Sequence, residues 1–310
     1  MKPLVIIAGP TAVGKSDAAI KLAKRIDGSI ISADSMQVYK GMDIGTAKVP
    51  KDQREGIDHY LLDVLDPKDD FNIVMFKEMA DAAMKEIWDK GRIPIIVGGT
   101  GFYIQSVLYD IDFTPADEMT SYRQELSELI SSRGGQYVHD MLKQVDPIAA
   151  NKIHPNDSRR MIRALEYHKQ TGMPISGHNL ESMNKSSPYR FCFFVLTDDR
   201  QKIYDRINVR VDKMIEQGLV DEVKALVNMG LNKNYVSMHG LGYKEIIDHI
   251  EGTISLEDAI YIIKRDTRHF AKRQLTWFKR EKDVSFINIS EEDVVETMLD
   301  QLDKKGIING

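Results

Sequence analysis

Residues 9–16 carry the pattern with the clearest chemical use in this chain, G-x-x-x-x-G-K-S. They are Gly9, Pro10, Thr11, Ala12, Val13, Gly14, Lys15 and Ser16. An apolar run at residues 4–8 precedes them and a helical pattern at 17–25 follows, so the motif joins a strand to a helix as a phosphate-binding loop requires. Backbone N–H groups and the helix N-terminus then hold anions, Lys15 adds a charge and Ser16 can bind Mg²⁺. The motif predicts a site for at least two linked phosphates.

A carboxylate stands just after the second apolar run, residues 29–32, where Asp34 begins the segment D-S-M-Q-V-Y-K. Facing a phosphate site, Asp34 could ligate Mg²⁺ or accept a proton from an incoming nucleophile, and it could also only cap a helix. Gln37 carries an amide that can read a nucleobase through two hydrogen bonds. Arg206 and Arg210 lie one helical turn apart, so one or both could bind phosphate or belong to a solvated helix face.

The third apolar run, residues 93–97, ends in Gly98-Gly99-Thr100 without an acidic residue. NTP-hydrolysing proteins with such a loop usually hold Mg²⁺ through an acidic residue at the end of a buried strand. Its absence argues against an ATPase or a motor. It favours a site that binds a diphosphate as a leaving group.

Continuous apolar runs separated by helical segments predict an α/β fold, with a P-loop NTPase-like parallel sheet flanked by helices. Ligands of such sheets bind at the carboxyl ends of the strands, so the 9–16 loop, Asp34 and Thr100 should face one crevice. The expected strands are residues 4–8, 29–32, 93–97, 191–196 and 286–289, and the expected helices are 17–25, 71–90, 200–217, 220–229, 243–249, 256–280 and 291–304.

After Pro115 the pattern changes to helical periodicity without a convincing strand, until about residue 188. We therefore expect an all-helical insertion domain at residues 116–188, inside a catalytic core formed by residues 1–115 and 189–310. Asp157 predicts a helix start, and Gly172 a helix stop.

The 310 residues are 42% hydrophobic and 29% charged, with a net charge of −5. No apolar run is long enough to cross a membrane and the start does not resemble a signal peptide, so we expect a cytoplasmic protein without a membrane partner. Cys192 is the single cysteine, which excludes a disulfide within the chain. Its apolar surroundings favour a buried thiol over a catalytic one.

The acidic net charge argues mildly against nonspecific nucleic-acid binding, but residues 264–283 hold eight Lys or Arg against three Asp or Glu, a local net charge of +5. Ile263, Phe270 and Trp277 recur every seven residues and predict an inward face, with the charges mostly outward. A second basic cluster lies in the insertion and consists of Arg159, Arg160 and Arg163. Each cluster alone is typical of a solvated helix face, but the two together favour a nucleic-acid partner.

Several motifs resemble those of one family, the tRNA dimethylallyltransferases, also called tRNA isopentenyltransferases. They are residues 9–16, 34–39, 43–48, 98–103, 157–166 and 264–274 with Trp277. The resemblance implies an enzyme that transfers the dimethylallyl group of dimethylallyl diphosphate to N6 of adenosine 37, beside the anticodon. The expected substrates are tRNAs that read codons starting with U.

The resemblance also implies roles for single residues. Residues 9–16 would bind the diphosphate with help from Arg210, and Ser16 would contact the expected cofactor, Mg²⁺. Lys15, Asp34 and Thr100 would be catalytic, with Asp34 as the base that takes the N6 proton of a flipped-out adenine. The tRNA contacts would be Asp34, Ser35, Met36, Gln37, Thr100, Arg123, Arg159, Arg160, Arg163, Lys272 and Arg273. We expect the protein to be a monomer.

Three alternatives remain open at this point. A small-molecule P-loop kinase would consume a nucleoside triphosphate, but it would have no use for residues 34–37 or for the basic helix. An adenylate isopentenyltransferase would prenylate free AMP, which leaves the insertion and both basic clusters without a role. A non-catalytic tRNA-binding protein would not need the intact Lys15, Ser16, Asp34 and Thr100.

Overall fold

The structure, a computed structural model, describes residues 1–111, 120–177 and 186–308. Contacts divide the chain into two units, one formed by Met1–Leu108 with Pro188–Gly310 and the other by Tyr109–Ser187. The predicted domain boundary between residues 115 and 116 lies outside the described residues.

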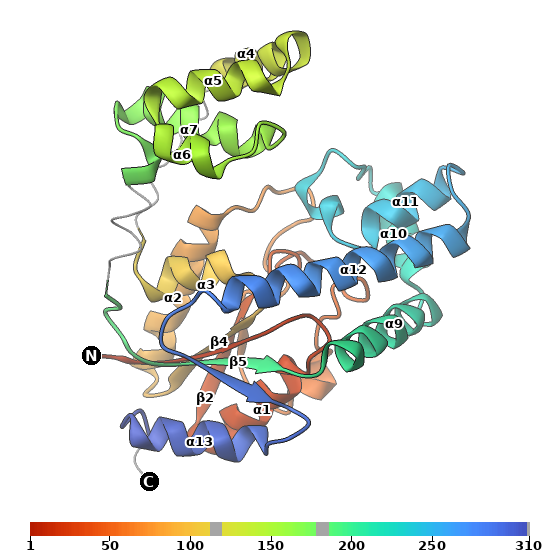
Figure 1. Cartoon of the computed structure of the whole chain (residues 1–310). Coiled ribbons are helices and arrows are strands. Elements are labelled where there is room, and N and C mark those ends of the chain that lie inside the picture. The colour runs from red at the N-terminus through yellow and green to blue at the C-terminus, as the bar shows by residue number, and fades with distance from the viewer. Residues whose placement is uncertain (112–119, 178–185, 309–310) are drawn as a thin grey trace. The chain divides into compact units, whose positions relative to one another are not determined.

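The first unit is built on a sheet of six described strands, all parallel, in the order β3-β2-β4-β1-β5-β6 (Figure 1). The central strands are buried on both faces, which explains why their apolar runs are continuous rather than alternating. The predicted parallel sheet is confirmed. Its strands are β1 (Pro3–Ala8), β2 (Gly28–Ala33), β3 (His59–Tyr60), β4 (Ile93–Gly98), β5 (Arg190–Thr197) and β6 (Val284–Asn288).

Helices cover both faces of this sheet (Figure 1). Phe194 packs in a core with side chains of α1 and α13, while its neighbour Phe193 meets Phe278 of α12 on the opposite face, with ring centroids 6.2 Å apart. Successive strand residues point to opposite faces, so β5 serves both layers. The helices of this unit are α1 (Lys15–Ile26), α2 (Ile73–Asp89), α3 (Gly101–Leu108), α9 (Arg200–Glu216), α10 (Leu219–Asn228), α11 (Tyr243–Ile250), α12 (Leu256–Phe278) and α13 (Val294–Lys304), with 3₁₀ turns η1 (Lys51–Arg54) and η2 (Val236–His239).

One strand and one α-helix of this unit have no counterpart among the predicted elements. β3 contains two residues, which is too short for an apolar pattern. α3 follows a glycine-rich run and begins where the Thr100 carbonyl accepts hydrogen bonds from the N–H groups of Tyr103 and Ile104. Side-chain caps set several of the remaining helix starts; for example, the Asp199 carboxylate accepts from two N–H groups of the first turn of α9.

The strands β1, β2 and β4 end at the same level, because Gly98 pairs with both Ala8 and Ala33. A Cβ at Gly98 would lie 2.2 Å from the Ala33 carbonyl oxygen, so the two backbones approach closely only without a side chain there. The segments that begin with Gly9, Asp34 and Gly99 therefore leave the sheet side by side. Ligands of parallel sheets bind at this edge, beyond the carboxyl ends of the strands.

The second unit consists, over residues 120–177, of helices around their own core. Leu126, Val138, Leu142 and Met161 are fully buried there. The Asp157 carboxylate caps α7 and Gly172 ends it in the left-handed conformation, as predicted. The helices are α4 (Thr120–Arg133), α5 (Gly135–Val145), α6 (Pro147–Lys152) and α7 (Ser158–Thr171).

None of the helices that the structure describes is long and apolar enough to span a membrane.

Because the two units bury separate cores, we expect core truncations to act locally. Leu126→Ala and Leu302→Ala each shorten a fully buried side chain, in the second and the first unit respectively. Each should lower the free energy of unfolding of its own unit by about 2–5 kcal/mol. Hydrogen exchange read by mass spectrometry should accelerate only in the mutated unit, and acceleration throughout the chain would contradict separate cores.

Candidate active site

The 9–16 loop turns sharply between β1 and α1. Gly9 has a φ of +144°, and a Cβ there would lie 2.5 Å from the Leu196 carbonyl oxygen, so the position requires glycine. Gly14, at φ +94°, caps α1, and Lys15 and Ser16 begin the helix. The N–H groups of a first helical turn lack partners within the helix and attract anions.

The Lys15 ammonium is folded back onto this loop. Its Nζ donates to the carbonyl oxygens of Gly9, at 3.0 Å, and Pro10, at 2.8 Å. Burial, together with the nearby Arg210 guanidinium, lowers the pKa of Lys15 to about 7, and the Asp34 carboxylate only partly opposes this effect. Burial also lowers the pKa of Arg210. A protonated Lys15 would thus repel Arg210 in a poorly solvated place, and a bound anion would relieve this repulsion and favour the protonated lysine.

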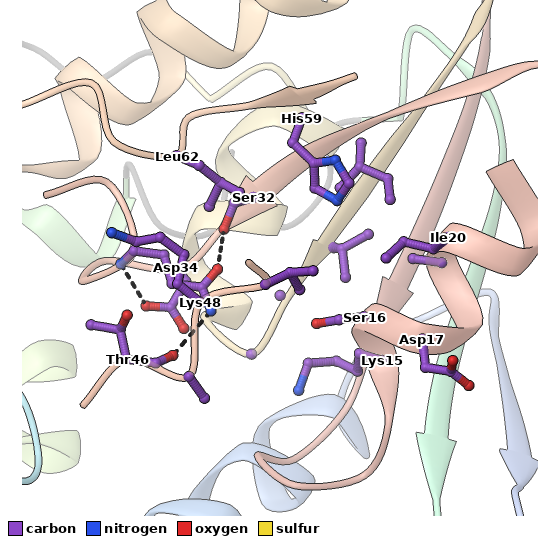
Figure 2. A pocket seen from close by; sticks show the side chains of 18 of the residues that line it. Lys15, Ser16, Asp17, Ile20, Ser32, Asp34, Thr46, Lys48, His59 and Leu62 are labelled. Atoms are coloured by element: carbon purple, nitrogen blue, oxygen red, sulfur yellow. Dashed lines mark hydrogen bonds between the residues drawn. The ribbon is translucent and has the colours of Figure 1, made fainter. Parts of the chain in front are cut away.

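A cavity of about 670 Å³ opens beside these cations, which is a size typical of small-molecule sites. Figure 2 shows Lys15 and Ser16 on one side of it and Asp34, Thr46 and Lys48 on another. Arg210 and Gln274 contribute from α9 and α12. Its apolar lining includes Ile20, Ile30, Val49, Leu62, Val97 and Phe270. The cavity therefore suits a ligand with an anionic end and an apolar part.

Asp34 presents one carboxylate oxygen to the backbone and keeps the other available. Its Oδ1 accepts hydrogen bonds from the N–H groups of Met36, at 2.9 Å, and Gln37, at 3.4 Å. Among the described residues, no other hydrogen bond or ion pair involves this carboxylate, and the side chain lines the cavity. Asp34 therefore caps a turn and also offers a proton acceptor or metal ligand.

The two arginines of α9 have different surroundings. Arg206 forms an ion pair with the Asp198 carboxylate, at 2.5 Å, just beyond the end of β5. Arg210 lines the cavity and lies close enough to Lys15 to lower its pKa. The sequence left the choice between them open, and the geometry places Arg210 at the phosphate-type loop.

Gln274 joins the loops that follow β1 and β4, and the sequence did not mark it as a site residue. This buried side chain of α12 accepts a hydrogen bond from the Thr11 N–H, at 2.9 Å, and donates one to the Gly99 carbonyl, at 3.1 Å. Thr100 follows Gly99 but is not among the residues that line the cavity. Thr11 and Gln274 are 263 positions apart, so no local pattern could reveal the contact.

Gln37 links β2 to the loop at residues 42–48. Its Oε1 accepts a hydrogen bond from the Ser32 hydroxyl, at 3.0 Å, and its Nε2 donates to the Thr46 carbonyl, at 3.1 Å. Ser35 and Met36 lie between Asp34 and Gln37 and are both partly exposed. In this structure the Gln37 amide shapes the cavity wall.

Glu222 of α10 is a second residue that the sequence did not single out. One carboxylate oxygen accepts from the N–H groups of Asp43 and Ile44, and the other from Gly45 N–H and the Tyr243 hydroxyl. The four distances lie between 2.7 and 3.1 Å. A single carboxylate thus holds the loop that supplies Thr46 and Lys48 to the cavity.

The predicted tRNA-contacting cations fall into both units. Lys272 and Arg273 are exposed on α12 and have no ion-pair partner in the described part of the chain. On α7, Arg159 is exposed, Arg160 lies 3.9 Å from Asp157 and Arg163 is half-buried. Arg123 of α4 donates two hydrogen bonds to the buried Glu166 carboxylate, at 2.8 and 2.7 Å.

The residues around the 9–16 loop fit Mg²⁺ only together with a phosphate ligand. The Ser16 side chain lines the cavity and makes no hydrogen bond to the described residues. No group of three or more His, Cys, Asp or Glu in the described chain is arranged to hold a metal. Mg²⁺ often binds through one or two protein oxygens, water and substrate phosphates, and Ser16 meets that requirement.

The lowered pKa of Lys15 predicts a pH-dependent stability difference between the wild type and Lys15→Met. Between pH 7 and about 10.5 the unfolded chain keeps the Lys15 proton, whereas the folded chain has largely released it. The free energy of unfolding of the wild type therefore rises with pH over this range, because the cost of burying Lys15 decreases. Urea unfolding should show the variant's relative stability decreasing from pH 7 to pH 10. A difference that does not change with pH would contradict the buried, neutral lysine.

Comparison with known sequences points to one family. Residues 37–281 match a family model described as IPP transferase, and residues 2–69 match one described as isopentenyl transferase. A tRNA dimethylallyltransferase of Lachnoclostridium phytofermentans is 55% identical over 312 residues, which cover 99% of this chain and 100% of that protein. One of Carboxydothermus hydrogenoformans is 50% identical over 306 residues, covering 99% and 98%.

Solved structures point to the same family. The full-length tRNA isopentenylpyrophosphate transferase of Bacillus halodurans is 41% identical, with a TM-score of 0.74 over 99% of this chain and 98% of that one. A eukaryotic dimethylallyltransferase, described as acting on tRNA, is 30% identical, with a TM-score of 0.81 over 98% of this chain and 76% of that one. By full-length similarity in sequence and fold, the chain belongs to the tRNA dimethylallyltransferase family of enzymes.

Proposed function

We propose that this enzyme transfers the dimethylallyl group of dimethylallyl diphosphate to N6 of adenosine 37 in tRNAs that read codons starting with U. The observation that carries the proposal is that Lys15, Arg210 and Asp34 line one cavity, which otherwise has many apolar side chains. Two cations suit a leaving diphosphate, and a carboxylate with one available oxygen suits a nucleophile that must lose a proton.

The diphosphate would bind at the 9–16 loop. Lys15 would exchange the Gly9 and Pro10 carbonyls for phosphate oxygens, and Arg210 would bind the same group. Positive charge at these oxygens stabilises the negative charge that develops as the allylic C–O bond breaks. Mg²⁺ held at Ser16 would supply further charge neutralisation to the leaving diphosphate. Charge stabilisation at this end therefore favours ionisation.

The acceptor needs a base, because the lone pair of an adenine N6 amine is delocalised into the ring. As the N6–C bond forms and the diphosphate leaves with the C–O electron pair, the Asp34 carboxylate would take the N6 proton. The N–H groups of Met36 and Gln37 hold the other oxygen of Asp34 in place. Apolar side chains such as Ile30, Leu62 and Val97 would surround the dimethylallyl group and keep water from the cationic carbon.

A base inside the anticodon loop cannot reach such a cavity unless it is extruded. Extrusion costs a few kcal/mol, which contacts to the RNA backbone can offset. Thr100 and Ser35 would lie near the extruded nucleotide. The cations proposed to contact the RNA are Arg123, Arg159, Arg160, Arg163, Lys272 and Arg273.

We also propose that the enzyme acts as a cytoplasmic monomer. A chain whose single cysteine, Cys192, is buried and free is in keeping with a reducing compartment.

The test is to incubate the purified protein with Mg²⁺, radiolabelled dimethylallyl diphosphate and unmodified tRNA, and then to analyse the nucleosides. Label in N6-dimethylallyladenosine at position 37, found only with tRNA, is the expected result. Label on free AMP would assign the chain to nucleotide acceptors. Turnover of ATP without prenyl transfer would overturn the proposal in favour of a kinase.

Asp34→Asn should slow the chemical step without weakening tRNA binding. Asparagine keeps an oxygen for the N–H groups of Met36 and Gln37 but cannot accept the N6 proton, so the single-turnover rate should fall by about 10²–10⁴-fold. Asp52→Asn, at an exposed carboxylate that lines the same cavity, is the control and should react like the wild type. An unchanged rate in Asp34→Asn would remove the general-base role.

Glu222→Gln should lower kcat/KM for tRNA more than it lowers the affinity for diphosphate. The amide nitrogen of glutamine cannot accept hydrogen bonds from N–H groups, so the 43–45 loop would lose at least one of its hydrogen bonds. We expect kcat/KM for tRNA to fall by about 5- to 150-fold. Tyr243→Phe removes one hydrogen bond and should have a smaller effect, and Asp221→Asn, on the adjacent exposed residue, should have none. An equal loss of diphosphate affinity would show general damage rather than a positioning role.

A further inference from the structure

Two aromatic rings are exposed beside the active-site loops. Phe102 of α3 is 45% exposed and Trp277 of α12 is 37% exposed, with ring centroids 6.4 Å apart and planes at 70°. The sevenfold spacing of apolar residues predicted an inward Trp277, and the structure corrects this, because the ring lies at the surface. Adjacent exposed aromatic side chains can serve as a contact surface, and no step proposed above uses them.

Two contacts within the chain hold the Trp277 ring in place. It occupies the space that a Cβ of Gly101 would fill, since that atom would lie 2.2 Å from ring atoms Cδ1 and Nε1. The indole N–H donates to the Glu281 carboxylate, which also accepts a hydrogen bond from Gln105 of α3, at 2.6 Å. Contacts within the chain therefore set the orientation of the ring.

This surface is continuous with the active site through α12. Gln274, one helical turn before Trp277, binds both Thr11 and Gly99. Phe102 and Gly101 follow directly after Thr100, the predicted catalytic residue. A molecule that enters the cavity over the 98–101 loop would pass the two rings.

The cations in the middle of α12 have polar partners, whereas those near its C-terminal end differ in this respect. In its middle, Lys264 pairs with Asp212, Arg265 with Asp266, and Arg268 donates to Asn208. Around Trp277, four exposed cations have no ion-pair partner among the residues that the structure describes. They are Lys272, Arg273, Lys279 and Arg280. Unpaired cations around exposed rings are typical of proteins that bind single-stranded nucleic acid, in which bases stack on aromatic side chains.

We propose that Phe102 and Trp277 form a stacking platform for an unpaired RNA base next to the nucleotide that is extruded into the cavity. The platform would replace the stacking that the neighbouring base loses when the target leaves the loop. The inference rests on the proposed function, because it names the part of the RNA substrate that this edge of the site recognises.

The first test reads the stacking contact directly. The chain has two tryptophans, Trp277 and Trp88. Trp88 lies on α2, and its indole N–H donates a hydrogen bond to the Pro3 carbonyl. Titration of the full-length protein with an anticodon stem-loop RNA should quench the tryptophan fluorescence. The quenching should disappear in Trp277→Phe and should remain in Trp88→Phe. Binding of the RNA without a Trp277-dependent signal would overturn the platform.

The second test separates stacking from charge. Phe102→Ala and Trp277→Leu should each weaken tRNA binding by about 5- to 150-fold at every salt concentration, with an unchanged salt dependence. Arg273→Gln should instead make binding less sensitive to salt. Tyr261→Ala, at a 62% exposed ring on the same helix, is the matched control and should bind like the wild type.

Two controls keep the inference separate from the proposed function and from misfolding. Diphosphate affinity should be unchanged in Phe102→Ala, because Phe102 is not among the residues that line the cavity or are proposed to bind the diphosphate. If the wild type transfers no dimethylallyl group to tRNA, the proposed function fails. If the wild type does transfer it and both aromatic variants keep the wild-type KM for tRNA, only the platform is wrong.

Discussion

The rest of this site depends on one constraint, which is that three parallel strands end at the same register position. Backbone pairing of Gly98 with Ala8 and Ala33 brings the ends of β1, β2 and β4 to one line. A polar segment follows each strand at the same edge. The 9–16 loop follows β1, Asp34 follows β2 and the 99–101 loop follows β4. Because parallel strands share one direction, every loop at this edge follows a strand, and the site collects residues that are far apart in the sequence.

Long-range hydrogen bonds fix these loops once the sheet has placed them. Gln274 joins the loops after β1 and β4, and Glu222 holds the 43–45 loop with both carboxylate oxygens. Losing one partner of such a partly buried contact leaves a polar group without its hydrogen bond, which is costly, so each contact restricts the loop to one arrangement. The helices α10 and α12 thereby act on the cavity from outside the sheet.

The distribution of charge separates the two ends of the reaction. Lys15 and Arg210 lie together near the N-terminus of α1, where burial lowers the pKa of both side chains. A bound anion would relieve the electrostatic repulsion between them. Asp34 lies on the other side of the cavity with one oxygen available. Farther out, the cations near Trp277 that have no ion-pair partner among the described residues make a basic surface on a chain whose net charge is −5.

The sequence by itself determined the parallel sheet, the phosphate-type loop and the position of Asp34 after β2, because continuous apolar runs and glycine spacing are local signals. It missed β3, which has only two residues and so carries no periodic pattern, and α3, which follows directly on a glycine-rich run. Only the tertiary structure separated Arg210 from Arg206, found Gln274 and Glu222, and turned Trp277 to the surface. Arg206 is distinguished by its ion pair with Asp198, whose geometry at the end of β5 the sequence does not give. The other outcomes depend on contacts across up to 263 positions and on the missing side chain of Gly101 against Trp277, which no window of neighbouring residues contains.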